Sequence, residues 1–163
     1  MIDEATGERL RALVRRESRS LLQYLREVPP WSGAADKHTV ERLRSLAQAE
    51  QAATDALGKY LQKRRAGLSH LGPYPAVFTD VNDAALSHLL PKVVREQKEA
   101  ATALEADAAM VSDADARTLV DRLVHLGCPC RGVCLHGLPA AVGEGARLMA
   151  RTARGRAKNS GVF

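Results

Sequence analysis

Apolar residues recur at three- and four-residue steps along most of the first 126 positions, the spacing that places side chains on one face of an α-helix. The first such stretch predicts a helix over residues 5–27, which ends where VPPWSG (residues 28–33) brings in two prolines. The second stretch predicts a long helix over residues 37–65, with Asp36 as its N-cap.

Two further helices are expected in the second half of the chain. A third amphipathic stretch covers residues 79–110, and Pro91 should bend it near Ser87 because proline lacks the backbone N–H that a helix needs. The sequence SDAD (residues 112–115), with Ser112 as N-cap, then predicts the start of a fourth helix over residues 116–126.

The lengths of the connections predict how these helices are arranged. The first and third connections are short, so each joins an antiparallel pair. The second connection has about 13 residues, and its reach of ~43 Å matches the length of the second helix. We therefore expect an all-α, ferritin-like four-helix bundle with one long crossover. An up-down-up-down bundle with a loose loop is the alternative.

Two glutamates interrupt the apolar stripes that should form the core. Glu17 lies in the middle of the first stripe and Glu50 in the middle of the second. An inward carboxylate needs a partner or a raised pKa, and two at matching depth suit a carboxylate-bridged metal site. The competing interpretation is a salt bridge to a nearby arginine, for which the candidates are Arg15, Arg19 and Arg95.

The third helix offers further candidate ligands near its midpoint. Glu96 is the better placed carboxylate, with Glu99 as the other choice, and His88 lies two turns earlier. His88 is therefore a candidate metal ligand, although a structural role beside the Pro91 bend is the competing interpretation.

Two phrases, RESRSLLQYLREVPPW and LGPYPAVFTDVNDAALSHLLPKVVREQ, resemble a group of short, mostly uncharacterised bacterial ferritin-like proteins, over about residues 9–126. The superfamily motif has a Glu on the first and third helices and Glu-x-x-His on the second and fourth. The resemblance implies that Glu17, Glu50 and Glu96 hold iron or another divalent metal. Ala53 stands where the first histidine belongs and the fourth helix has no match, so ferroxidase activity is not expected.

Composition supports a helical chain in the cytoplasm. Only 4% of residues are aromatic, which argues against a β-sandwich or barrel. No apolar run is long enough for a membrane span and no secretion signal is evident. We therefore expect a soluble cytoplasmic protein with no membrane partner, whose three cysteines stay reduced. Trp31 and Tyr74, beside prolines, are expected to pack at the ends of the bundle.

The last part of the chain differs in charge. Residues 1–127 carry 18 basic and 18 acidic residues, so the formal net charge of +5 comes entirely from residues 128–163. This divides the chain into a helical bundle and a basic Cys/Gly/Arg-rich tail. Nucleic acid or another acidic partner is expected only through that tail. Four residues there could hold zinc, though they crowd into one short loop: Cys128, Cys130, Cys134 and His136.

The fourth helix should continue beyond residue 126, but the sequence turns to Cys, Pro, Gly and Arg there. We therefore hypothesise that a frameshift, natural or from sequencing, replaced the end of the fourth helix with residues 127–163 and left that helix short. A shortened helix leaves apolar surface on the other three, which the tail or a second copy of the chain would cover.

Two functions follow from the sequence. The first is a ferritin-like protein with a degenerate metal site, whose ligands are drawn from Glu17, Glu50, Glu96 and His88. The second is a non-catalytic helical scaffold or interaction module with a basic tail for acidic partners. The sequence contains no nucleophile–base pair and no phosphate loop, and it assigns no substrate or reaction to either function.

Overall fold

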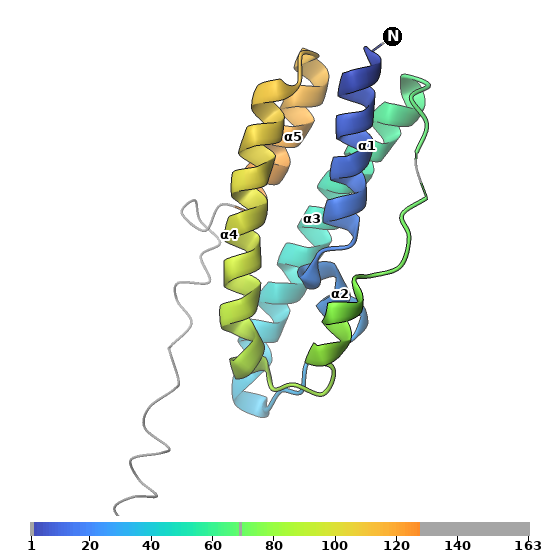
Figure 1. Cartoon of the computed structure of the whole chain (residues 1–163). Coiled ribbons are helices and arrows are strands. Elements are labelled where there is room, and N and C mark those ends of the chain that lie inside the picture. The colour runs from blue at the N-terminus through green and yellow to red at the C-terminus, as the bar shows by residue number, and fades with distance from the viewer. Residues whose placement is uncertain (1, 69, 128–163) are drawn as a thin grey trace, which may run out of the picture.

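The computed structural model describes residues 2–68 and 70–127, and this part of the chain is all-helical (Figure 1), as the sequence predicts. Its elements in order are α1 (Glu4–Ser18), α2 (Leu21–Glu27), η1 (Ala34–Asp36), α3 (Lys37–Lys63), η2 (Ala76–Val81), α4 (Leu86–Met110) and α5 (Ala114–Gly127), where η marks a 3-10 helix.

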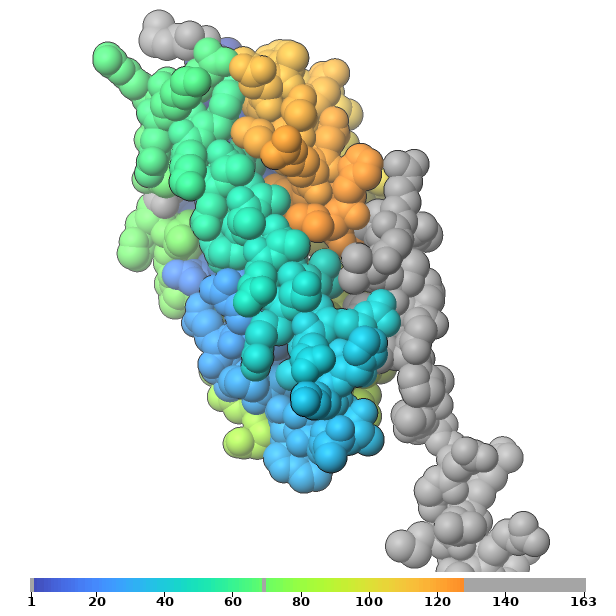
Figure 2. Space-filling model, turned by 180° about the vertical axis from the view of Figure 1, so that it is seen from behind, coloured from blue at the N-terminus to red at the C-terminus, as the bar shows by residue number. Residues whose placement is uncertain are grey.

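The long connection between α3 and α4 runs from one end of the molecule to the other. Residues 64–85 cover this distance, so α3 and α4 point the same way, while α1 and α5 point the opposite way (Figure 1). Seen from behind, α3 runs along one face and α5 lies beside its C-terminal half (Figure 2). We call this connection, residues 64–85, the crossover. Two arginines bind it: Arg11 of α1 donates to the Ala66 carbonyl at 2.7 Å, and Arg19, just after α1, donates to the Gly72 carbonyl at 2.8 Å.

The single helix predicted over residues 5–27 is wrong, because the chain forms two helices there. α1 ends at Ser18, and the hydroxyl of Ser20 accepts the backbone N–H of Gln23 at 3.2 Å as the N-cap of α2. Ser-x-x-Gln is a capping sequence, so a local signal for this break was present within an otherwise continuous apolar stripe.

The third helix starts later than residue 79. Residues 76–81 form η2, and Asp83 then takes a left-handed backbone conformation with φ of 62°, which an α-helix cannot include. α4 begins at Leu86. Pro91 consequently lies near the start of α4, and the carbonyl that it leaves without a helical partner belongs to the exposed residue Ser87, where water can reach it.

Trp31 is fixed through its backbone and exposed through its side chain. Its N–H donates to the Ala84 carbonyl at 3.2 Å, and its carbonyl accepts the Leu86 N–H at 2.9 Å. The indole is 73% exposed, so its predicted packing role is wrong. Tyr74 does pack, with its ring edge-on against Tyr24 at 5.3 Å.

Asp36 occupies the N-cap position of α3 as predicted, but its carboxylate accepts the Gly33 N–H at 2.8 Å and makes no capping hydrogen bond to the helix. The predicted cap of the last helix, Ser112, is wrong. At α5 the capping carboxylate is that of Asp113, which accepts the Ala116 N–H at 3.0 Å. The hydroxyl of Ser112 instead donates to Asp3 at 3.2 Å.

The buried apolar side chains form two clusters. The α1–α5 cluster consists of Leu10, Leu13, Val14, Leu57, Tyr60, Leu61, Leu104, Ala108, Val111, Ala116, Val120 and Leu123. The α2–η2 cluster consists of Leu21, Leu22, Tyr24, Leu25, Leu43, Leu46, Ala47, Phe78, Val81, Leu86, Leu89 and Val93. The buried polar side chains of Glu17, Glu50 and Gln97 come between the two sets along α1, α3 and α4.

Several predictions concern residues that the structure does not describe. The basic tail, the zinc ligand set and the frameshift hypothesis fall on residues 128–163, and α5 is described up to Gly127. Within residues 2–68 and 70–127, none of the helices combines the length and the apolar character that crossing a membrane requires.

Candidate functional site

The carboxylate of Glu50 is the centre of the buried polar layer. Glu50 is only 5% exposed, and three neutral groups donate hydrogen bonds to it. Ser20 Oγ and Gln23 Nε2 reach Oε1 at 2.7 and 3.0 Å, while Gln97 Nε2 reaches Oε2 at 3.2 Å. We call these four residues the Glu50 cluster. Because both carboxylate oxygens have partners, little of the cost of burying the group remains uncompensated.

The three donors come from separate elements that the fold brings together. Ser20 and Gln23 lie at the start of α2, and Gln97 lies at the middle of α4. Gln23 Nε2 also donates to the Ala47 carbonyl at 2.8 Å, which fixes the orientation of its amide. Gln23 Oε1 is buried and has no hydrogen-bond partner among the described residues. The break between α1 and α2 therefore positions half of the Glu50 cluster.

Glu17 is buried beside this cluster but has a different partner. It is 3% exposed, and its Oε1 accepts Arg16 Nε at 2.8 Å. Arg16 also donates to Asp107 of α4 at 3.0 Å. Burial raises the pKa of Glu17 above its ordinary value of 4.5, Arg16 opposes that rise, and the nearby carboxylates of Glu50 and Asp107 add to it. The salt-bridge interpretation thus applies to Glu17, with Arg16 and not the arginines predicted.

Glu96 does not take the position on α4 that faces Glu50, because Gln97 occupies it. Glu96 is half-buried, and this burial raises the pKa of its carboxyl above 4.5. Lys92 and Arg95 lower that pKa, while Glu99 raises it. Glu96 therefore lies at the edge of the polar layer, one position along the helix from the residue that enters it.

His88 is exposed in the first turn of α4. It precedes Gln97 by nine positions, a separation of ~13 Å along a helix. The structure thus brings Glu17 and Glu50 into one buried layer, puts Gln97 where Glu96 was expected, and leaves His88 at the surface.

The donor set does not fit a two-metal carboxylate centre. Such centres take four carboxylates and two histidines from four helices. No group of three or more His, Cys, Asp and Glu side chains within residues 2–68 and 70–127 is arranged to hold a metal. The groups that surround Glu50 present amide and hydroxyl protons to it, and a cation would have to displace them.

Sequence reasoning missed Ser20, Gln23 and Gln97. Gln97 had a signal, because it continues the apolar series Leu89, Val93 and Ala101 at four-residue steps. A polar residue in such a series is a candidate for the interior in the same way as Glu17 and Glu50. Ser20 and Gln23 depend on the break between α1 and α2, which apolar periodicity does not mark.

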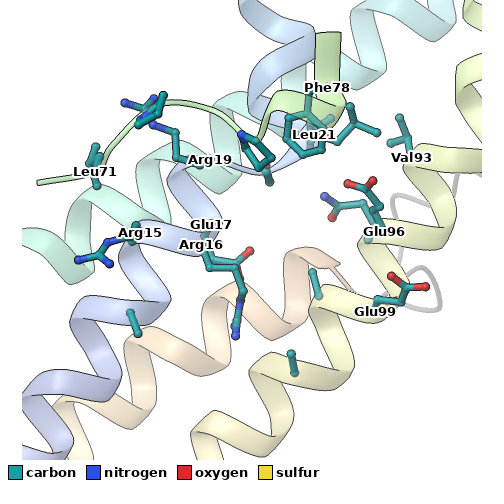
Figure 3. Close-up of a pocket in the computed structure, with 18 residues that line it drawn as sticks. Arg15, Arg16, Glu17, Arg19, Leu21, Leu71, Phe78, Val93, Glu96 and Glu99 are labelled. Carbon is teal, nitrogen blue, oxygen red and sulfur yellow. The ribbon is translucent and has the colours of Figure 1, made fainter. Parts of the chain in front are cut away.

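An open groove of about 680 Å³ leads from the surface to this layer. Its lining comes from α1, α2, the crossover and α4 (Figure 3). The lining includes Glu17, Ser20 and Gln97 of the polar layer. Arg15 and Arg19 lie on the α1 side, and Glu96 and Glu99 lie on the α4 side. Its volume is in the range of small-molecule sites.

Comparisons with known proteins do not add a family to this description. We found no match for the chain among protein-family models, curated proteins or solved structures.

Proposed function

We propose that this chain is a non-catalytic, ferritin-like helical bundle in which the Glu50 cluster replaces a metal centre. The observation that carries the proposal is the hydrogen bonding of Glu50, whose two oxygens accept from Ser20, Gln23 and Gln97. Neutral donors compensate a buried carboxylate without a metal ion. A buried polar layer in which both oxygens of the carboxylate are hydrogen-bonded favours one packing of the helices, since alternative packings would leave that carboxylate unpaired.

The ferritin-like part of the proposal is supported by connectivity. Ferritin-like bundles consist of two antiparallel helix pairs joined by one long crossover. This chain has the same order: α1 pairs with α3, residues 64–85 form the crossover, and α4 pairs with α5. The buried glutamates of α1 and α3 correspond to the first two positions of the ferritin-like motif.

A single divalent cation between Glu17 and Glu50 is the competing function. One observation favours it: Glu17 and Glu50 are both buried, and the charge of Glu50 raises the pKa of Glu17. A cation there would relieve this repulsion. The bound ion would then stabilise the fold and would not need the histidines that the motif lacks.

Metal analysis distinguishes the two functions. We expect the full chain, purified aerobically and then incubated with Fe²⁺, Mn²⁺ or Zn²⁺ and desalted, to retain well under one ion per chain. Glu17→Gln and Glu50→Gln should not change that content. A stoichiometric metal in the wild type that is lost in both variants, and kept in the exposed-site control Glu105→Gln, would replace the proposal with the metal-binding function.

The basic tail gives the scaffold a proposed partner class, argued from sequence alone. The whole net charge of +5 lies in residues 128–163, so we expect salt-dependent retention on a polyanion column. Deleting residues 140–163 should abolish that retention. Equal retention of the deleted chain would show that the tail is not the contact.

A further inference from the structure

A second open groove lies between α3 and α5, where the two helices are side by side (Figure 2). Its volume is about 720 Å³, and most of its lining is apolar. The α3 side consists of Leu46 and four alanines, which are Ala49, Ala52, Ala53 and Ala56. The α5 side consists of Thr118, Asp121, Arg122, His125 and Leu126. We call this space the α3–α5 groove.

The four alanines form the floor of the α3–α5 groove. They follow one another at i, i+3, i+4 and i+7, so their methyl groups share one face of α3. Ala52 is exposed and the other three are half-buried, so another helix can contact this face without displacing a core side chain. Small side chains at the contact also let the axes of two packed helices come close together.

The rest of the chain starts at one end of this groove. Because α3 and α5 run in opposite directions (Figure 1), His125 and Leu126 line the end near Leu46, and α5 is described up to Gly127. Residues 128–139 have an extended reach of ~40 Å. The groove floor from Leu46 to Ala56 is ~15 Å long. A segment that begins at residue 140 can therefore reach either end of the groove.

Residues 140–153, AAVGEGARLMARTA, have the amphipathic pattern of a helix that could fill this space. Their apolar residues recur at i, i+4, i+7, i+8 and i+11, which is one helical face: Val142, Ala146, Met149, Ala150 and Ala153. Three of these five are alanines, as on the facing surface of α3, and Arg147 and Arg151 lie on a different face. A helix over residues 140–153 would be ~21 Å long, enough to cover the groove floor.

We propose that residues 140–153 of the same chain form a helix that docks in the α3–α5 groove, with the apolar face of that helix on the alanines of α3. The arginines of the segment stay at the surface, where a polyanion can reach them. Gly143 and Gly145 each weaken a helix by about 1 kcal/mol, so this helix depends on docking. The proposal is independent of the Glu50 cluster. It opposes the frameshift hypothesis, because a segment translated in the wrong frame has no reason to match the groove.

Amide hydrogen exchange of the full chain, followed by mass spectrometry, tests the docking. We expect the amides of residues 142–153 to exchange about tenfold more slowly in the wild type than in Ala52→Arg, which puts a long charged side chain into the groove. Ala52 is exposed, so the variant should fold, which circular dichroism checks. The matched control Ala106→Arg, at an exposed position of α4 outside the groove, should exchange as the wild type does. Fast exchange of residues 142–153 in the wild type, or equally slow exchange in Ala52→Arg, overturns the proposal.

Two variants of the segment test which of its faces makes the contact. Met149→Gln removes an apolar side chain from the proposed contact and should speed exchange of residues 142–153 about tenfold. Arg151→Gln, on the other face, should leave that exchange unchanged. Equal effects of the two variants would show that the apolar face is not the contact. Protection that grows with protein concentration, together with a dimer in light scattering, would mean that a second copy fills the groove, and the proposal would be wrong.

Discussion

The two apolar clusters are of similar size but are built in different ways. The α1–α5 cluster is enclosed by segments of four regular helices, α1, α3, α4 and α5. The α2–η2 cluster is enclosed by the seven-residue helix α2, the 3-10 helix η2 and the N-terminal halves of α3 and α4. Helical periodicity alone specifies the first cluster. The second cluster also needs the break between α1 and α2 that Ser20 caps, the left-handed backbone of Asp83, and a crossover that places Phe78 in the core.

Truncating a leucine in each cluster should give the largest effect. Leu57 and Leu89 are fully buried, so we expect Leu57→Ala and Leu89→Ala to lower the free energy of unfolding by about 2–5 kcal/mol each. Leu57→Ala should cost more, because regular helices relax less into a cavity than η2 and the crossover do. Urea unfolding followed by circular dichroism measures both. A larger cost for Leu89→Ala would contradict the comparison.

Removing Glu50 tests the layer that separates the clusters. Glu50→Ala leaves the donors on Ser20, Gln23 and Gln97 without their acceptor, so we expect a loss of about 3 kcal/mol. Glu50→Gln keeps an acceptor oxygen and should cost less. Unfolding free energies of the two variants check this order, with Glu105→Gln as the surface control. If Glu50→Ala were neutral, the Glu50 cluster would have no structural role.

Removing the Ser20 cap of α2 should destabilise the α2–η2 cluster. Ser20 both caps α2 and donates to Glu50, so we expect Ser20→Ala to lower the free energy of unfolding by about 1–2 kcal/mol. Amide hydrogen exchange should accelerate in α2 more than in α1. The control Ser45→Ala, at an exposed position of α3, should change neither. Equal acceleration in both helices would mean that the clusters open together.

The smallest effect concerns pH. The folded state holds the proton of Glu17 more tightly than the unfolded chain does, because burial raises its pKa above 4.5. The unfolding free energy therefore falls as pH rises from 4.5 through the raised pKa. Glu17→Gln cannot ionise, so its stability should fall less over this range. Asp3 and Asp113 have lowered pKa values and act in the opposite sense below 3.8.

The pH dependence of stability needs a control for Glu96, the other carboxyl whose pKa is raised. Glu96 also has a raised pKa, so Glu96→Gln should remove a separate part of the fall. If Glu17→Gln leaves the profile identical to that of the wild type, the ionisation of Glu17 is not coupled to folding.

Sequence periodicity predicted the regular parts of the fold and the burial of the two central glutamates. The predicted helix over residues 37–65 is close to α3, and Glu17 and Glu50 are buried where their stripes placed them. The break before Ser20 lies inside an uninterrupted apolar stripe, so it depends on a local cap that competes with helix continuation.

The composition of the polar layer was harder to predict. Gln97 faces Glu50 and Glu96 does not, a difference of 100° around α4. The four-residue apolar series of Leu89, Val93 and Ala101 marks Gln97 as the inward position, but a search limited to carboxylates selects its neighbour Glu96. The partner of Glu17 is its neighbour Arg16, although adjacent residues on a helix do not normally face each other. α1 is in its last turn there, and this lets the two side chains meet.

The fixed, exposed Trp31 determines which optical signals can report on this protein. It is the only tryptophan in the chain, and its indole is 73% exposed, so its emission in the folded state should resemble that of a hydrated indole. Unfolding would then change the emission wavelength little, even when the core is fully lost. Near-ultraviolet signals from Tyr24 and Phe78, whose rings pack at 5.7 Å, would follow the α2–η2 cluster instead.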